Sequence, residues 1–420
     1  MNTTKKAALL MSSLSIYRGL TQHPVIKAFH ELISSVDGSV WDFTEAWGHF
    51  FSLLCENGCV SDWARYLTQA VLYDDNAFSR AAAAGKTADL PEPMLRAVRR
   101  DLSVLRRLSL LRPETILSDY CHQDELGFVV RELPRWQNGQ PIGEFCHEDK
   151  TLEELSAFYR HNGCGMFARY RAFIWRSGRI EPVSYPDSIT LSSLKSYEVQ
   201  RQAVVDNTLA FLKGVNSNNC LLYGDRGTGK SSTVKALLNA YACEGLRMVE
   251  MPKDRLGDFP LLVERLAEIP LKFIIFIDDL SFSSDDKSYA QLKAVLEGGL
   301  AVRPYNTLIY ATSNRRHIVK ESFAERSGDD IHVNDTIQET LSLSDRFGLA
   351  VNFSKPNKEQ YLAIVEGLAA EKHLCVDRDK MVHDAEQFAI SRGGRSPRCA
   401  IQFIAALETE LTLSSAAVTE

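Results

Sequence analysis

The segment from Gly224 to Ser231 constrains this chain more than any other part of its sequence. It reads Gly-Asp-Arg-Gly-Thr-Gly-Lys-Ser, in which two glycines separated by four residues precede a lysine and a hydroxyl. Glycines let the backbone wrap so that successive N–H groups point at a phosphate, and a helix that starts there adds its positive end. The motif predicts a phosphate-binding loop. The alternative is a glycine-rich turn between a strand and a helix.

The residues of this loop have expected roles in binding ATP and Mg²⁺. Lys230 is expected to reach the β- and γ-phosphates, and the hydroxyl of Ser231 to ligate Mg²⁺. An apolar run, Cys220–Tyr223, precedes the loop, and a helix-compatible run follows it. The residues predicted to bind the nucleotide are Gly224, Asp225, Arg226, Gly227, Thr228, Gly229, Lys230, Ser231 and Ser232.

A second apolar run ends in two adjacent carboxylates. Residues 273–277 read Phe-Ile-Ile-Phe-Ile, and Asp278 and Asp279 follow them. Ionised groups at the end of a buried strand need partners, and open parallel sheets bind ligands at the carboxyl ends of their strands. We therefore expect Asp278 to hold Mg²⁺ through water and Asp279 to polarise the attacking water as a base. The alternative is a capping aspartate before Leu280.

Short apolar runs that alternate with helical patterns predict an α/β fold with a parallel five-stranded sheet from about residue 200. Three helical stretches follow Pro356, and Gly393-Gly394 separates the second from the third. We predict a helical domain over residues 1–180, an α/β core over 181–356 and a helical lid over 357–420. The expected strands are Cys220–Tyr223, Arg247–Met251, Phe273–Ile277, Leu308–Ala311 and Leu349–Phe353.

The N-terminal third reads as mostly helical. Apolar residues recur every three or four positions, as on one face of a helix, first at Trp47, Phe50, Phe51 and Leu54 and then at Trp63, Tyr66, Leu67 and Ala70. Ser61-Asp62 is a plausible cap for the second helix. Residues 94–113 alternate leucine and valine with arginines, among them Arg96, Arg99, Arg100, Arg106 and Arg107. This pattern favours an amphipathic helix with a solvated basic face over a nucleic-acid-binding helix.

The composition of the 420 residues is that of an ordinary globular protein, with 45% hydrophobic and 24% charged residues. The net charge of −6 gives no general attraction to nucleic acid. The nine cysteines are scattered singly and form no CxxC pair, as in a protein with reduced thiols. No apolar run approaches the roughly 20 residues of a membrane span. We therefore expect a cytoplasmic protein without a membrane span.

The motifs taken together resemble the AAA+ superfamily of ATPases, and most of all its bacterial family known as domain of unknown function 815. The resemblance covers roughly residues 150–410. It is carried by Leu222–Ser232 (Leu-Tyr-Gly-Asp-Arg-Gly-Thr-Gly-Lys-Ser-Ser), Asp278–Phe282 (Asp-Asp-Leu-Ser-Phe), Leu296–Gly299 (Leu-Glu-Gly-Gly), Tyr310–His317 (Tyr-Ala-Thr-Ser-Asn-Arg-Arg-His) and Leu343–Gly348 (Leu-Ser-Asp-Arg-Phe-Gly).

The resemblance implies three further catalytic residues. Asn314 resembles sensor 1, the polar residue that helps to place the attacking water between Asp279 and the γ-phosphate. Arg346 resembles the arginine finger, which enters a neighbouring subunit's site and contributes on the order of 10³ or more in rate. Arg398 resembles sensor 2, a lid arginine that touches the γ-phosphate of its own subunit. The resemblance also implies a homo-oligomeric ring, most often a hexamer.

Each of these three residues has an ordinary alternative. Asn314 would serve as a turn residue, Arg346 as part of a surface salt bridge, and Arg398 as a residue near a helix start. Arg315 and Arg316 are also candidates for a role in a neighbouring subunit. By analogy, the adenine would lie near residues 189–197, between the core and the lid.

Two departures from the family pattern bear on function. Many AAA+ proteins carry Glu as the second acid, whereas this chain carries Asp279, one methylene shorter, which implies slow turnover. The residues after Met251, Pro-Lys-Asp-Arg-Leu-Gly-Asp-Phe-Pro, contain no aromatic–apolar–Gly pore loop of the kind that unfoldases use. This departure weakens a protein-threading interpretation.

The sequence thus supports an ATP-hydrolysing AAA+ protein that acts as an oligomeric switch or remodelling machine on a macromolecular client, either protein or nucleic acid. The alternative is a nucleotide-gated loader for a nucleic-acid-associated partner, with little turnover. A small-molecule kinase is a third hypothesis, and it would need an acceptor pocket and a lid motif of its own. Fold analogy does not name the client.

Overall fold

The chain is described here from a computed structural model. The structure describes residues 1–120, 127–140, 151–280, 282–283, 292, 296, 304–314, 319–320, 346–374 and 376–417. Internal contacts divide the chain into two compact units, Met1–Arg169 and Tyr170–Glu420. The three-domain division at residues 180 and 356 stays a prediction.

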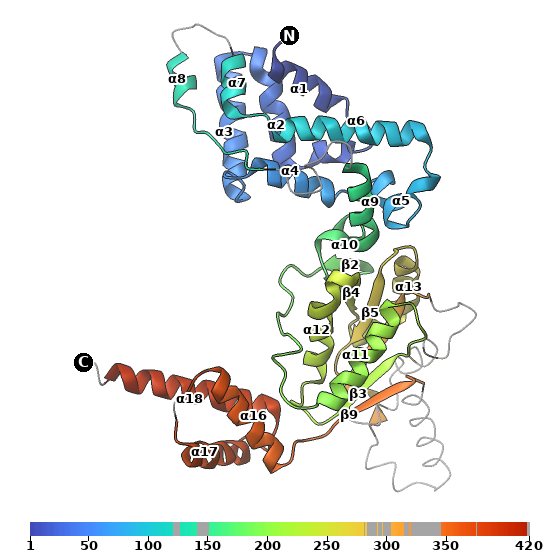
Figure 1. The fold of residues 1–420 in the computed structure, drawn as a ribbon, viewed down its shortest axis with the longest axis vertical. Helices are drawn as coiled ribbons and strands as arrows, with labels where there is room; N and C mark the ends of the chain where they lie inside the picture. The colour runs from blue at the N-terminus through green and yellow to red at the C-terminus, as the bar shows by residue number, and fades with distance from the viewer. Residues whose placement is uncertain are drawn as a thin grey trace. The chain divides into compact units, whose positions relative to one another are not determined.

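The first unit is built from helices. They are α1 (Thr3–Ser12), α2 (Pro24–Ser34), α3 (Val40–Glu56), α4 (Trp63–Leu72), α5 (Ala77–Ala83), α6 (Glu92–Ser109), α7 (Pro113–Asp119), α8 (Gly127–Glu132), α9 (Thr151–Asn162) and α10 (Met166–Arg169), with short 3₁₀ helices at Arg18–Gln22, Ser35–Asp37 and Thr87–Asp89. The helical N-terminal region predicted from the apolar periodicity is thus confirmed (Figure 1). The Asp62 side chain accepts a hydrogen bond from Arg65 N and caps α4, as expected.

Aromatic packing forms the centre of this unit. The rings of Phe29, Phe50 and Trp63 pack against one another, with centroid separations of 4.6–5.3 Å. Asp101 of α6 is fully buried, and one of its carboxylate oxygens accepts hydrogen bonds from the backbone N–H groups of residues 15–17. These charge-assisted bonds tie α6 to the segment after α1. The buried apolar face of α6 confirms the amphipathic interpretation.

The second unit contains a seven-stranded sheet in the order β2-β1-β4-β5-β7-β3-β9. Its strands are β1 (Ala172–Arg176), β2 (Arg179–Pro182), β3 (Cys220–Gly224), β4 (Leu246–Glu250), β5 (Lys272–Ile277), β7 (Thr307–Ser313) and β9 (Leu349–Phe353). All five predicted strands are confirmed, and they pair in parallel. A separate two-stranded pairing joins β6 (Phe282–Ser283) to β8 (Val319–Lys320).

Strands β1 and β2 extend the sheet beyond the five strands predicted. β1 pairs in parallel with β4 and antiparallel with β2. The hairpin turns at Ser177 and Gly178, whose φ angles are 49° and 72°, and two consecutive positive φ values suit a tight hairpin. In β1, Phe173 and Trp175 are buried and alternate with more exposed residues. This run is short, and its aromatic residues obscured the two-residue period.

Three helices pack on the sheet: α11 (Glu198–Leu212), α12 (Lys230–Tyr241) and α13 (Phe259–Ala267) (Figure 1). The core between α11, α12 and the strands includes Val204, Leu222, Leu237, Ile274 and Tyr310. β5 is buried over its last five residues and β7 along its whole length, which explains their near-continuous apolar sequences. Short 3₁₀ helices lie at Ala242–Glu244 and Lys253–Asp258.

After β9 the chain forms a three-helix cluster, which we call the lid. Its helices are α16 (Lys358–Glu371), α17 (Arg378–Ser391) and α18 (Pro397–Ala417). Tyr361, Ile364, Ala385 and Phe403 are among its buried core residues. Gly393 and Gly394 separate α17 from α18, as predicted. Among the residues that the structure describes, no helix is long and apolar enough to cross a membrane.

Candidate phosphate-binding site

The predicted phosphate loop connects β3 to α12. Gly224 has a φ of 130°, and a Cβ added there would lie 2.3 Å from the carbonyl oxygen of Phe353 in the neighbouring strand. Gly229 has a φ of 91° and is the N-cap of α12. A side chain at either position would strain the backbone, and at Gly224 it would also clash. The glycines thus set both the close strand contact and the sharp entry into the helix.

Lys230 begins α12 and turns its side chain back over the loop. Its ammonium donates hydrogen bonds to the carbonyl oxygens of Gly224 and Asp225, at 3.0 and 2.6 Å, and to Asn314 Oδ1 at 3.3 Å. The residue is only 6% exposed. Burial lowers the pKa of Lys230, and the nearby carboxylates of Asp225, Asp278 and Asp279 oppose this shift. A buried cation of this kind favours an anionic ligand.

The register of the sheet brings Asp278 to the same place. Ile277 pairs with Ala311, so Asp278 follows β5 beside Thr312 of β7. Asp278 Oδ1 accepts hydrogen bonds from Ser231 Oγ at 2.6 Å and from Thr312 Oγ1 at 2.5 Å. The first residue of the two-carboxylate motif is therefore joined directly to the loop hydroxyl, as expected for two ligands of one ion.

Asp279 has a left-handed backbone, with a φ of 50°. Its N–H donates to Thr312 Oγ1 at 2.9 Å, and its carboxylate accepts from Asn314 Nδ2 at 2.6 Å. A non-glycine residue with positive φ is uncommon and costs conformational energy. The bond to Thr312 holds the backbone of Asp279, and the bond from Asn314 holds its carboxylate, despite this cost.

Backbone N–H groups after β9 and in the lid contact the phosphate loop from another direction. The Asp225 carboxylate accepts a hydrogen bond from Lys355 N at 2.8 Å. Arg398 N donates to the carbonyl oxygen of Gly227 at 3.1 Å. Arg398 and Lys230 line the same cavity, and the charge of Arg398 is among the causes that lower the pKa of Lys230.

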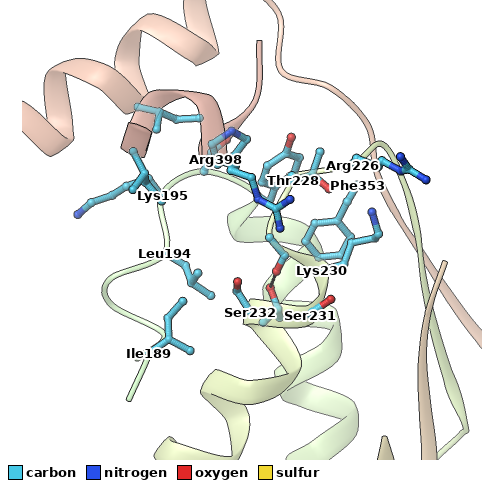
Figure 2. A pocket seen from close by; sticks show the side chains of 18 of the residues that line it. Ile189, Leu194, Lys195, Arg226, Thr228, Lys230, Ser231, Ser232, Phe353 and Arg398 are labelled. Carbon is cyan, nitrogen blue, oxygen red and sulfur yellow. Dashed lines mark hydrogen bonds between the residues drawn. The ribbon is translucent and has the colours of Figure 1, made fainter. Parts of the chain in front are cut away.

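The phosphate loop lines one side of a cavity of about 1060 Å³. Figure 2 shows Ile189 and Leu194 on the opposite side from Lys230 and Phe353, with Arg398 near the loop. The apolar side chains away from the loop include Ile189, Leu194 and Ile364 of α16, beside the charged Lys195 and Glu371. The cavity therefore has a charged part and an apolar part, an arrangement that suits a ligand with both.

The structure gathers most of the predicted site residues at this cavity. The predicted residues that line it are Arg226, Gly227, Thr228, Gly229, Lys230, Ser231, Ser232, Asp278, Asp279, Asn314 and Arg398. Gly224 and Asp225 lie directly behind it, where their carbonyl oxygens accept from Lys230. Arg226 is exposed, and Figure 2 shows its guanidinium directed away from Lys230.

Arg346 lies elsewhere. It precedes β9, whose far end, Phe353, lines the cavity. The five residues of β9 span on the order of 15 Å, and Arg346 is not among the described residues that line the cavity. β9 is also an edge strand. Arg315 and Arg316 lie outside the described residues.

Sequence reasoning missed Thr312. Its hydroxyl donates to Asp278 and accepts from the N–H of Asp279, so it joins both carboxylate residues. The sequence offered one indication of its role: Thr312 lies two residues before Asn314, and residues two apart in extended chain point to the same side. A threonine in an otherwise apolar buried strand needs a polar partner.

The sheet order, the glycine loop before α12, the paired carboxylates and the helical lid together define a P-loop α/β protein of the AAA+ class. The chain belongs to the family described as "Protein of unknown function (DUF815)", whose model matches residues 168–411. Comparison with curated proteins found no significant match.

Among solved structures, the chain is similar to RuvB from Thermotoga maritima. A RuvB mutant gives 14% identity and a TM-score of 0.38, and the match covers 54% of this chain and 67% of that one. A structure titled as the RuvB Holliday junction branch migration motor gives 15% identity and a TM-score of 0.38, with 54% and 66% covered. Likeness of this size carries no further conclusion.

Proposed function

We propose that this protein binds ATP with Mg²⁺ and hydrolyses it, acting as an oligomeric switch or remodelling machine on a macromolecular client. The observation that carries the proposal is the meeting of Lys230, the Ser231–Asp278 pair and the Asp279–Asn314 pair at one cavity. Among P-loop proteins this set of groups positions phosphates, an ion and a water. We also propose that the protein acts in the cytoplasm.

The residues present fit a magnesium ion. Ser231 Oγ and Asp278 Oδ1 lie 2.6 Å apart and are oxygen atoms of the kind that Mg²⁺ prefers, so Ser231 would bind the ion directly and Asp278 would hold it through water. An ion at this position would neutralise charge on the phosphate oxygens and complete its shell with them and with water. Ser231 would exchange its bond to Asp278 for a contact with the ion. Thr312 would keep the Asp278 carboxylate in its present orientation.

Lys230 and Arg398 would hold the transferred phosphate. Lys230 would leave the carbonyl oxygens of Gly224 and Asp225 for the β- and γ-phosphate oxygens, which are stronger acceptors because they are charged. Arg398 is anchored beside Gly227 by its backbone N–H. Its side chain would add a second positive charge from the lid.

Asp279 and Asn314 would act on the attacking water. Asp279 would accept its proton, and Asn314, which donates to Asp279 at 2.6 Å, would orient both. A base of this kind contributes typically 10²–10⁴ in rate. The apolar side of the cavity, with Ile189 and Leu194, would receive the base of the nucleotide.

Arg346 would complete the site of a neighbouring subunit. It lies in the turn before β9, an edge strand whose far end reaches the cavity of its own subunit. A head-to-tail contact between identical subunits forms a ring when the rotation closes. We therefore propose a homo-oligomeric ring, with a hexamer as the expected size.

One observation favours a second candidate, a nucleotide-gated loader with little turnover that acts for a nucleic-acid-associated partner. Asp279 has a short side chain, and one of its carboxylate oxygens already accepts from Asn314. The Asp279 carboxylate can therefore contact the attacking water from few positions, and this restriction favours slow hydrolysis. In such a loader, ATP binding alone would drive the change of state.

Steady-state ATP hydrolysis tests the proposal and separates the two candidates. The wild-type protein should hydrolyse ATP only with Mg²⁺, and Lys230→Ala should abolish both turnover and binding while leaving the circular dichroism spectrum unchanged. Turnover that rises with DNA, RNA or an unfolded protein would support a machine and indicate its client. ATP binding with negligible turnover under every condition would support the loader. Undiminished ATP binding by Lys230→Ala would contradict the proposal that the loop binds the phosphates of ATP.

A further inference from the structure

The apolar side of the cavity is formed by a segment without regular secondary structure. We call residues 187–197 the strap; this fully described segment contains one turn and neither helix nor strand. Six of its residues line the cavity, from Ile189 to Tyr197. Because no ladder of backbone hydrogen bonds holds such a segment, its shape depends on side-chain contacts, both within it, as between Thr190 and Ser193, and from elsewhere.

We infer that Arg201 and Asn239 are positioning residues that hold the strap in the shape required by the nucleotide base. The inference rests on the proposed function, since it presumes a nucleotide in the cavity. Neither residue was singled out by its sequence motif. Each is placed in this role by a pair of hydrogen bonds to backbone carbonyl oxygens of the strap.

Arg201 holds the middle of the strap from α11. Its Nη1 donates to the carbonyl oxygens of Leu191, at 3.0 Å, and of Leu194, at 2.5 Å. The side chain is 14% exposed, and its Nη2 pairs with Glu198 at 3.1 Å. A planar guanidinium fixed in this way sets the separation of the two carbonyl groups. It thereby sets the position of Leu194, which faces the cavity.

Asn239 holds the start of the strap from α12. Its Nδ2 donates to the carbonyl oxygens of Asp187, at 2.8 Å, and of Ile189, at 2.6 Å. One turn earlier on the same face, Lys235 lies 3.7 Å from Asp187. The amide nitrogen of Asn239, and not its oxygen, faces the two carbonyl oxygens, because an amide oxygen has no proton to donate to them.

The location of Asn239 links the two ends of the site. It lies on the helix that begins with Lys230 and Ser231, nine residues earlier, or about 13 Å along the axis. One rigid helix therefore carries the phosphate contacts at its start and the strap contact near its end. Arg201 and Asn239 would affect recognition of the base and leave recognition of the phosphates unchanged.

Binding of two ligands tests this division. Inorganic tripolyphosphate with Mg²⁺ presents the phosphate chain alone, whereas ATP presents the chain and the base. Calorimetric titrations should show that Asn239→Ala and Arg201→Ala each weaken ATP binding about tenfold, as expected for the loss of two hydrogen bonds. Tripolyphosphate binding should stay within about twofold of wild type, since the phosphate loop is intact.

Two further substitutions keep the test sharp if truncation unfolds the protein. Asn239→Asp preserves shape but removes the donor, and Arg201→Lys preserves charge but not the planar fork. Asn207→Ala is a matched control, because Asn207 on α11 also holds a loop through its amide, bonding the backbone of Asn218. It should lose stability without changing the ratio of ATP to tripolyphosphate affinity.

The possible results are distinct. A selective loss of ATP affinity in the Arg201 and Asn239 variants supports the inference. Equal losses for both ligands, or no loss for either, would overturn it. Wild-type protein that binds neither ligand, or that binds tripolyphosphate as tightly as ATP, would instead contradict the proposed function.

Discussion

Ser231 Oγ lies 2.6 Å from Asp278 Oδ1, although 47 positions separate the two residues in the sequence. The strand order explains this contact. β7 lies between β3, which leads to Ser231, and β5, which leads to Asp278. Thr312 of β7 lies between the ends of these two strands, and its hydroxyl also donates to Asp278. The candidate ion site is thus assembled from the ends of three adjacent parallel strands.

Thr312→Val should weaken this assembly. Valine has nearly the same shape, so the change removes one hydroxyl that bonds Asp278 and accepts from Asp279 N. We expect a loss of about 1–3 kcal/mol in the free energy of unfolding. We also expect a higher Mg²⁺ concentration for half-maximal ATP binding, measured by titration of the metal.

Thr208→Val provides the control for this substitution. Thr208 is also fully buried, and its hydroxyl bonds Val204 O and the Tyr310 hydroxyl, away from the carboxylates. It should lower stability by a similar amount and leave the Mg²⁺ dependence unchanged. An unchanged Mg²⁺ dependence in Thr312→Val as well would mean that Asp278 does not rely on this contact.

Lys230 should make the affinity for ATP fall at alkaline pH. Burial lowers its pKa below the ordinary value of 10.5, so in the folded protein without ligand the charged form is disfavoured. Bound phosphates favour the charged form and raise the pKa again. Between these two values ATP binding should take up a proton, and affinity should fall as pH rises through this range.

Calorimetry in buffers of different ionisation enthalpy measures this uptake. Proton uptake by Lys230 should appear as the pH is raised into the range between its lowered pKa and its pKa in the complex. A constant affinity and zero proton uptake by Lys230 over the same range would show that its charge does not contact the phosphates.

The sequence predicted the central strands and the loop because each depends on local patterns. The apolar run before Asp278 and the glycine spacing before Lys230 are visible within eight residues. β1 was missed because a five-residue strand that ends in a tight hairpin at Gly178 carries little periodic signal. Its pairing with β4, about 75 residues later, is a tertiary contact.

Parts of the site were beyond sequence reasoning for the same reason. Thr312 gains its role only when β7 lies between β3 and β5, and Arg201 only when the strap folds back onto α11. Asn314 and Arg398 were reached through family resemblance, and the structure places both at the cavity. Their catalytic roles stay predictions.

Mixing of subunits tests the proposed role of Arg346. Arg346→Ala should bind ATP normally yet lose turnover, because the substitution leaves the subunit's own cavity intact. Lys230→Ala should bind no ATP. In a mixed ring, an intact Lys230 site would meet an intact Arg346 from its neighbour, and ATPase activity should partly recover.

The mixing experiment also defines the outcome that would contradict this role of Arg346. The oligomers in each mixture should be measured by light scattering or analytical ultracentrifugation, with ATP expected to increase their size. If mixed oligomers form without any recovery of activity, Arg346 does not act on a neighbouring site. A role in its own subunit or in a surface salt bridge would then replace the proposal.

The most direct test of the central claim, that this cavity hydrolyses ATP with Asp279 as the base, is single-turnover hydrolysis by Asp279→Asn. Asparagine tolerates the positive φ at this position, so the variant should fold and bind ATP within about threefold of wild type. Asp254→Asn, at an exposed carboxylate on another segment, is the control. We predict that Asp279→Asn retains bound ATP while its hydrolysis rate falls by about 10² or more. Hydrolysis at the wild-type rate would contradict the account.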